Sequence, residues 1–185
     1  MTGGPSHYPP GVAKRYKEIW SEEDISYADK IQDELGLPFV LAHGDSRQTN
    51  VVCKRAADGN ERLVKILDWQ FVHPTSICVD IGRFLCWSAE ASVRRASTYE
   101  VLRHYHATLT AEFEKVGQKA PFSLEKVLRA YKRTFKHATM CFVPISHVFF
   151  AQIPEFEKAQ LKNIAAVVDE LIQLHDNKSV LWKWH

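Results

Sequence analysis

The sequence lacks any apolar run long enough to cross a membrane, and its first ten residues contain no basic stretch followed by an apolar one. A membrane-spanning helix needs about 20 predominantly apolar residues in succession, and a secretory signal needs both N-terminal features. These absences lead us to expect an untargeted protein with no membrane partner.

The sequence also has no large excess of positive or negative charge and no closely paired cysteines. The 24 basic and 22 acidic residues leave a net charge of +2, which provides no general field for attracting nucleic acid. The four cysteines include no C-x-x-C pair, and three of them lie in apolar surroundings where a reduced, buried thiol is usual. We therefore predict no nucleic-acid partner and a cytoplasmic, reducing compartment.

Length and composition favour a single folded domain. The chain has 185 residues, of which 45% are hydrophobic, and this is enough to build a substantial core. Residues 1–20 begin with a stretch rich in glycine and proline, so we interpret them as a flexible leader. Residues 21–185 are predicted to form the domain, in which no internal repeat or low-complexity segment occurs.

The first part of the domain is predicted to contain a helix and a small sheet. Ser21 is a candidate N-cap for a helix that ends at Gly36, and residues 39–42 should be extended. A β-hairpin is expected next, with strands over residues 51–55 and 62–67 around a tight turn at Asp58-Gly59.

The remainder of the domain has helical periodicity. Helices are predicted over residues 80–87 and 98–116, and a third should begin at Ser123 and be kinked or ended by Pro144. Pro154 suits the first position of a last helix. Arg94-Arg95 is interpreted as a solvated face, with contact to an acidic partner as the alternative.

Polar residues suited to chemistry gather where the predicted strands end. Asp45 follows the first strand, Asn50 comes five residues later, and Asp68 closes the hairpin. Counting back from a two-residue turn pairs Asn50 with Leu67, or with Asp68 after a slip of one residue, so that Asn50 and Asp68 are neighbours either way. Such oxygen donors suit a hard divalent cation, and the cluster therefore suggests a metal and phosphate site.

The spacing of Asp45 and Asn50 matches the catalytic loop of kinases, in which an aspartate orients the attacking hydroxyl and an asparagine binds a metal ion. A single aspartate at a strand end is more often a turn or capping residue. The joint pattern of Asp45, Asn50, a hairpin and Asp68 reverses that preference and favours phosphoryl transfer.

The segments His43-Gly44-Asp45, Asn50 and Ile66-Leu-Asp-Trp-Gln70 resemble the catalytic core of the choline kinase and aminoglycoside phosphotransferase superfamily. The likeness is closer to its CHK kinase-like branch, which includes ecdysteroid kinase-like proteins, and it covers about residues 20–150. It implies the C-terminal lobe of the protein kinase-like fold. That lobe is α+β and mainly helical, with a small β-hairpin at the catalytic site followed by a helical bundle.

The resemblance also implies roles for individual residues. It makes Asp45 the catalytic base, Asn50 and Asp68 ligands of Mg²⁺, and His43 and Asp80 structural supports of the catalytic loop. ATP and the hydroxyl of a small molecule would be the substrates. The pair Ser46-Arg47 departs from the Leu-Trp that the family usually has after the His-Gly-Asp motif.

Kinases of this family carry an N-terminal lobe of strands with a lysine that holds the α- and β-phosphates of the nucleotide. The residues before His43 show no such pattern, so we expect a C-terminal lobe with an incomplete ATP pocket. Three hypotheses stay open: a small-molecule kinase that an N-terminal lobe completes, an inactive remnant serving as a binding or regulatory module, and a truncated product of a larger gene. The acceptor and the oligomeric state cannot be predicted.

Overall fold

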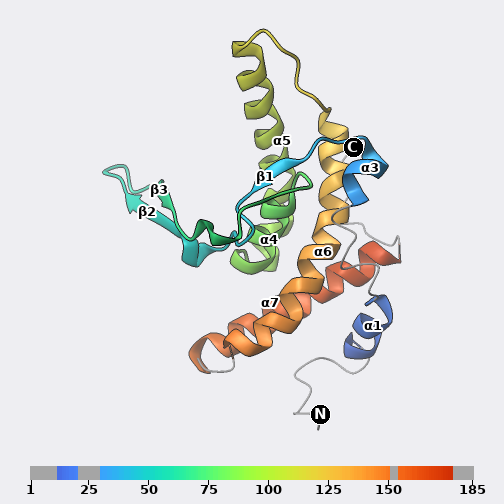
Figure 1. Ribbon diagram of the computed structural model, residues 1–185. Helices are drawn as coiled ribbons and strands as arrows, with labels where there is room; N and C mark the ends of the chain where they lie inside the picture. The colour runs from blue at the N-terminus through green and yellow to red at the C-terminus, as the bar shows by residue number, and fades with distance from the viewer. Residues whose placement is uncertain (1–11, 21–29, 151–153, 177–185) are drawn as a thin grey trace.

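The computed structural model describes residues 12–20, 30–150 and 154–176, which form a mainly helical α+β fold, as predicted (Figure 1). None of the helices in these ranges is long and apolar enough to span a membrane. The elements follow in the order α1 (Val12–Ile19), α3 (Ile31–Leu35), β1 (Val40–Ala42), η2 (Gln48–Asn50), β2 (Val51–Arg55), β3 (Glu61–Ile66), η3 (Trp69–Phe71), β4 (His73–Thr75), α4 (Val79–Ser88), α5 (Ala91–Lys115), α6 (Leu124–Phe150) and α7 (Pro154–His175).

The strands form two separate antiparallel pairs, β1 with β4 and β2 with β3. The predicted hairpin is β2–β3, which extends away from the helices in Figure 1, and every residue of β3 is exposed. The β1–β4 pair was not predicted. It aligns Leu41 with Pro74 and Ala42 with His73, so the segment after η3 lies beside the strand that leads to Asp45.

The hairpin reaches the expected register by another route. Its strands begin to pair at Arg55 and Glu61, so residues 56–60 form a longer loop than the predicted two-residue turn. A β-bulge in the middle of the strands then shifts the pairing by one residue. As a result the N–H of Leu67 donates to the carbonyl oxygen of Asn50 at 2.8 Å, which is the pairing that the sequence predicts.

The core is centred on α6, against which α3, α4, α5 and α7 pack. Gly82 of α4 faces Thr134 and Ala138 of α6, where a Cβ atom would be in ordinary van der Waals contact. Large side chains that are fully buried fill the interface between α5, α6, α7 and the segment before α4, and they include Ile77, Leu102, Tyr131, Phe135, Phe142, Ile164 and Leu171.

The helix that begins after Ser123 is α6, which continues through Pro144 to Phe150. Of the two predicted alternatives, a kink or an end at Pro144, the prediction of an end is therefore wrong. A proline removes one backbone hydrogen bond from a helix interior. The carbonyl oxygen of Met140, four residues before Pro144, instead accepts the hydroxyl of Tyr16 at 3.3 Å, and Val143 and Ser146 are buried. The N-terminus is as predicted, since the hydroxyl of Ser123 accepts the N–H of Lys126 at 3.4 Å.

Part of the predicted leader is a helix. Residues 12–19 form α1, which packs against α7. Arg15 binds the carboxylate of Asp176, and the hydroxyl of Tyr16 donates to the carbonyl oxygen of Met140 at 3.3 Å. The rest of the leader and the predicted N-cap Ser21 lie outside the described residues, whereas the helix end at Gly36 is observed with φ +58°.

The prediction that Arg94-Arg95 forms a solvated face is wrong for Arg94. Its side chain is fully buried and donates to both carboxylate oxygens of Glu170, at 2.9 and 3.0 Å. The neighbouring Arg95 donates to the same carboxylate at 2.8 Å. Glu170 is the acidic partner that the alternative required, but it belongs to this chain, and the cluster joins α5 to α7.

The four cysteines are free. Cys78 and Cys86 are buried, as expected of thiols in apolar surroundings, whereas Cys53 is exposed on the hairpin. Burial raises the pKa of the Cys86 thiol to about 12, so this side chain is neutral at physiological pH.

Candidate active site

The loop that carries Asp45 is attached to the start of α4 by Asp80. The carboxylate of Asp80 accepts the backbone N–H groups of His43 at 2.6 Å and Gly44 at 3.1 Å. The hydroxyl of Ser46 donates to Asp80 as well, 2.8 Å from its carbonyl oxygen and 3.1 Å from its carboxylate. Asp80 thus binds His43 and Gly44 before Asp45 and Ser46 after it. These hydrogen bonds hold the loop in place on both sides of Asp45.

The imidazole of His43 connects this loop to the hairpin. Its Nδ1 accepts the backbone N–H of Asp45 at 3.2 Å, so a neutral ring carries its proton on Nε2 and donates to the carbonyl oxygen of Leu67 at 2.7 Å. The side chain is buried, and the edge of the ring packs on Trp69 with 4.7 Å between centroids. Both ring nitrogens are therefore used in positioning, and neither is available to act as a base.

Gly44 occupies a position that no other residue fits without strain. Its φ is +82°, and a Cβ atom at this position would lie 2.2 Å from the carbonyl oxygen of Phe71. The loop and the end of η3 therefore approach each other at a distance that only glycine permits.

Gly44→Ala is expected to lower the free energy of unfolding by about 2–4 kcal/mol, because a left-handed conformation and a backbone clash are combined. Urea unfolding followed by circular dichroism measures the change. Gly59→Ala is the matched control, since Gly59 also has φ +82° but nothing lies within 4 Å of its Cβ position. Equal losses for the two variants would contradict the close approach at Gly44.

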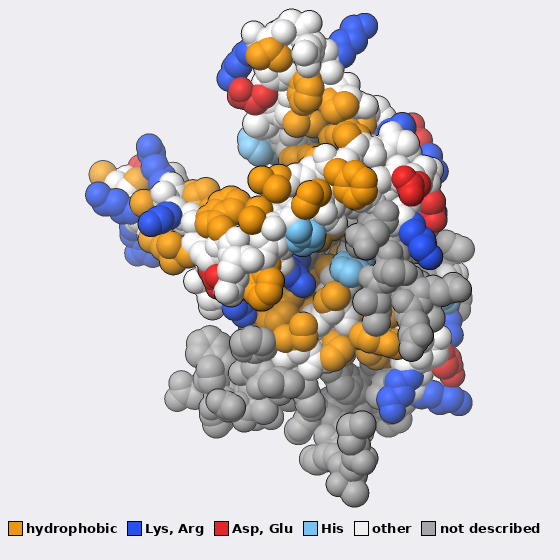
Figure 2. Space-filling model, viewed as in Figure 1, with side chains coloured by type: hydrophobic (Ala, Val, Ile, Leu, Met, Phe, Trp, Pro, Cys, Tyr) orange, Lys and Arg blue, Asp and Glu red, His pale blue; other side chains and the backbone are white. Residues whose placement is uncertain are grey.

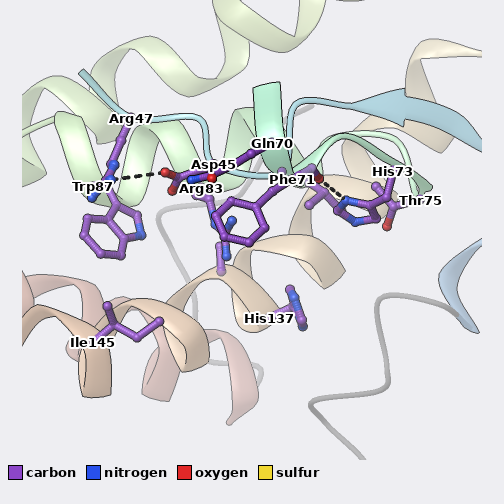
Figure 3. Close-up of a pocket in the computed structure, with 13 residues that line it drawn as sticks. Asp45, Arg47, Gln70, Phe71, His73, Thr75, Arg83, Trp87, His137 and Ile145 are labelled. Atoms are coloured by element: carbon purple, nitrogen blue, oxygen red, sulfur yellow. Dashed lines mark hydrogen bonds and ion pairs between the residues drawn. The ribbon is translucent and has the colours of Figure 1, made fainter. Parts of the chain in front are cut away.

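Asp45 lies between a carboxamide and a guanidinium. The Nδ2 of Asn50 donates to the carboxylate Oδ2 of Asp45 at 3.1 Å and to its carbonyl oxygen at 2.9 Å. Arg47 forms an ion pair with the same Oδ2 at 3.1 Å, and its guanidinium lies 5.8 Å from the ring centroid of Trp87. In the part of the chain that the structure describes, Oδ1 of Asp45 accepts no hydrogen bond, and the side chain borders a cavity (Figure 3).

Asn50 and Asp68 are brought close together by the hairpin, since Asp68 follows the residue that pairs with Asn50. Asp68 is exposed and adopts a left-handed conformation with φ +62°. The structure shows no hydrogen bond to the carboxylate of Asp68 or to Oδ1 of Asn50 from any described residue. The same ranges hold no group of three or more His, Cys, Asp or Glu side chains suited to a metal, so a cation here would rely on Asn50.

A cavity of about 640 Å³ lies beside Asp45, between the loop, the η3–β4 segment, α4 and α6 (Figure 3). Among the residues that the structure describes, Asp45 is the one carboxylate in its wall. The other lining side chains are cationic, aromatic, apolar or neutral polar, and they include Arg47, Arg83, Phe71, His73, Trp87, His137 and Ile145. A cavity of this size suits a small organic molecule.

Several of these lining residues are not identifiable from the sequence. His137 and Ile145 lie on α6, whose apolar periodicity indicates core packing only, and far from Asp45 in the chain. Arg83 lies within residues 20–150, the part of the chain that resembles the kinase family, but nothing in the sequence indicates that it faces the same cavity as Asp45. Figure 2 shows hydrophobic side chains gathered on this face of the molecule, and Phe39, Leu41, Trp69 and Phe71 are among the exposed large hydrophobic residues.

Comparison with known proteins gives a family and two relatives. The family model DUF1679, described as "Uncharacterized oxidoreductase dhs-27", matches residues 10–179. An uncharacterized kinase-like protein of Caenorhabditis elegans is 28% identical over 125 residues, which are 68% of this chain and 31% of that protein. The uncharacterized oxidoreductase dhs-27 of the same organism is 33% identical over 105 residues, 55% of this chain and 13% of that protein.

The chain thus spans less than a third of the length of either relative. No solved structure matches it. The kinase-like protein of Caenorhabditis elegans is one protein to which this chain is similar. Because the family model covers nearly the whole sequence, the chain belongs to the DUF1679 family.

Proposed function

We propose that this chain is the catalytic part of a phosphotransferase that moves the γ-phosphate of ATP to a hydroxyl of a small molecule. The observation that carries the proposal is the carboxylate of Asp45, which borders a cavity and is held by Asn50 at 3.1 Å. Asn50 is in turn paired with the residue before Asp68. The similarity to a kinase-like protein supports the same reaction class.

In this proposal Asp45 is the catalytic base. Its Oδ1 accepts the proton of the acceptor hydroxyl while the hydroxyl oxygen forms a bond to the γ-phosphorus, and the bond from that phosphorus to the bridging oxygen breaks to release ADP. The contribution of the protein is chiefly alignment. Asn50 and the support from Asp80 keep the carboxylate and its loop in one orientation.

The donor atoms at Asn50 and Asp68 fit Mg²⁺. A hard cation prefers oxygen ligands, and these side chains offer a carboxamide oxygen and a carboxylate that the described residues leave without hydrogen-bond donors. When bound, Mg²⁺ would neutralise the charge on the phosphate oxygens of ATP. Asp68 would then provide the charged ligand and Asn50 the neutral one.

A second candidate function is a non-catalytic binding module. The observation in its favour is the ion pair of Arg47 with Asp45, which occupies Oδ2 of the proposed base. Arg47 occupies the position at which the kinase family that this sequence resembles usually has tryptophan. In this alternative Arg47 would neutralise Asp45, and the cavity would bind a ligand without transferring a phosphate.

The test has two measurements on the purified protein. Calorimetry with Mg-ATP reports binding, and γ-labelled ATP with a panel of primary and secondary alcohols and water reports transfer. We expect binding that Asp68→Ala weakens at least tenfold, through loss of a charged metal ligand, and transfer to at least one alcohol. Binding of Mg-ATP without transfer to any acceptor supports the binding module. A protein that shows neither binding nor transfer contradicts the kinase proposal.

A further inference from the structure

The charges around the cavity do not balance. Arg47 and Asp45 form an ion pair and offset one another, which leaves the guanidinium of Arg83 as an additional positive charge in the wall. Arg83 is half-buried on α4 and makes no salt bridge with any residue that the structure describes. A partly buried charge with no counterion is unfavourable, so this position favours an anion.

The immediate neighbours of Arg83 do not provide that anion. One titratable neighbour is the thiol of Cys141; burial raises the pKa of that thiol, although Arg83 acts in the opposite direction. Cys141 is therefore a neutral partner. Its sulfur lies 3.6 Å from Nε2 of His137, which also lines the cavity, and His73 borders it from β4. The imidazoles add hydrogen-bonding capacity and, when protonated, further positive charge.

The position of the cavity relative to the proposed metal ligands indicates which substrate it holds. Asp45 lines the cavity, whereas Asn50 and Asp68 do not. The phosphates of a nucleotide would lie with Mg²⁺ on the side of Asn50 and Asp68. Because Asp45 lines the cavity and the proposed metal ligands do not, the cavity suits the other substrate, whose hydroxyl must reach Asp45 for transfer.

We propose that the acceptor is an alcohol with an anionic group, such as a carboxylate, and that Arg83 binds this group while the hydroxyl lies at Asp45. This inference rests on the proposed function. Phe71, Trp87 and Ile145 line the same cavity (Figure 3). Their side chains provide apolar surface for the carbon skeleton of the acceptor. A guanidinium can bind a carboxylate through two parallel hydrogen bonds, which selects an anion over a neutral group of the same shape.

The test compares two probes of nearly the same shape, the anionic para-(hydroxymethyl)benzoate and its neutral amide. Calorimetry on the whole protein, without nucleotide, is expected to show binding about 10- to 100-fold tighter for the carboxylate. Arg83→Gln should remove that preference, and Arg83→Lys should restore part of it because the charge is retained. The exposed Arg129 of α6 provides the control, since Arg129→Gln should leave the preference unchanged.

Three results would overturn the inference. The first is equal binding of the carboxylate and the amide to the unsubstituted protein. The second is a preference that persists in Arg83→Gln, provided that its thermal unfolding shows a folded protein. The third is displacement of the carboxylate by Mg-ATP together with weaker Mg-ATP binding in Arg83→Gln, because the anion site would then belong to the nucleotide.

Measurements of binding and of phosphate transfer together separate this inference from the kinase proposal. A charge-dependent preference that requires Arg83, found in a protein that transfers no phosphate, would support the anion site and contradict catalysis. Transfer to neutral alcohols at the same rate as to their carboxylate analogues would support catalysis and contradict the anion site.

Discussion

Asp45→Asn is expected to reduce the rate of phosphoryl transfer by about 10²- to 10⁴-fold at saturating Mg-ATP, the contribution typical of a general base. Asparagine has nearly the same shape as aspartate and can still occupy the space beside Asn50 and Arg47. It cannot accept the proton of the attacking hydroxyl. The rate of product formation from γ-labelled ATP measures the effect, and Mg-ATP binding should persist.

The matched control for this experiment is Asp58→Asn. Asp58 is exposed in the hairpin loop, where its carboxylate accepts the N–H of Asn60 at 3.0 Å, and asparagine can make the same contact. We expect an unchanged transfer rate. A full rate in Asp45→Asn would rule out Asp45 as the base, and an equal loss in the two variants would attribute the effect to general destabilisation of the fold.

Glu170→Gln is expected to lower the free energy of unfolding by about 3–5 kcal/mol, as for a buried ion pair that loses one partner. Glu170 is fully buried and accepts hydrogen bonds from Arg94 and Arg95. Glutamine preserves the shape but leaves the buried guanidinium of Arg94 without a counterion. Urea unfolding, with the midpoint and slope compared against the unsubstituted protein, measures the loss.

Glu112→Gln is the matched surface control. Glu112 forms an ion pair with Lys115 on α5 at 2.6 Å, but both side chains are more than half exposed. Exposed pairs contribute about 0–1 kcal/mol, so a loss in that range is expected. A loss below about 1 kcal/mol in Glu170→Gln would contradict the assigned role of the buried cluster.

Local features of the fold were predictable because short-range interactions control them. The N-cap Ser123, the helix-ending Gly36 and Pro154 at the start of α7 act within a few residues of the chain. The separation of Asp45 and Asn50 is also local, and their side chains are in direct contact. The sequence could therefore indicate the loop half of the candidate site.

The hairpin shows where local reasoning gives the right pairing for an incomplete reason. A tight turn at Asp58-Gly59 predicted Asn50 opposite Leu67, and this pair is observed. The longer loop and the bulge shift the register in opposite directions and cancel. Neither feature has a clear signal in the residue pattern, because a bulge depends on how the strands twist against each other.

The sequence by itself determined the fold class, the helix ends at Gly36, Ser123 and Pro154, and the spacing of Asp45 and Asn50. It did not determine every helix boundary, since α5 (Ala91–Lys115) begins well before the predicted residue 98. The tertiary structure alone decided that Arg94 is buried against Glu170, that Pro144 stays within α6 and that Arg83 shares a cavity with Asp45. The reason is physical. Burial of a charge, compensation for a lost hydrogen bond and the lining of a cavity all depend on residues distant in the chain, which no local pattern specifies.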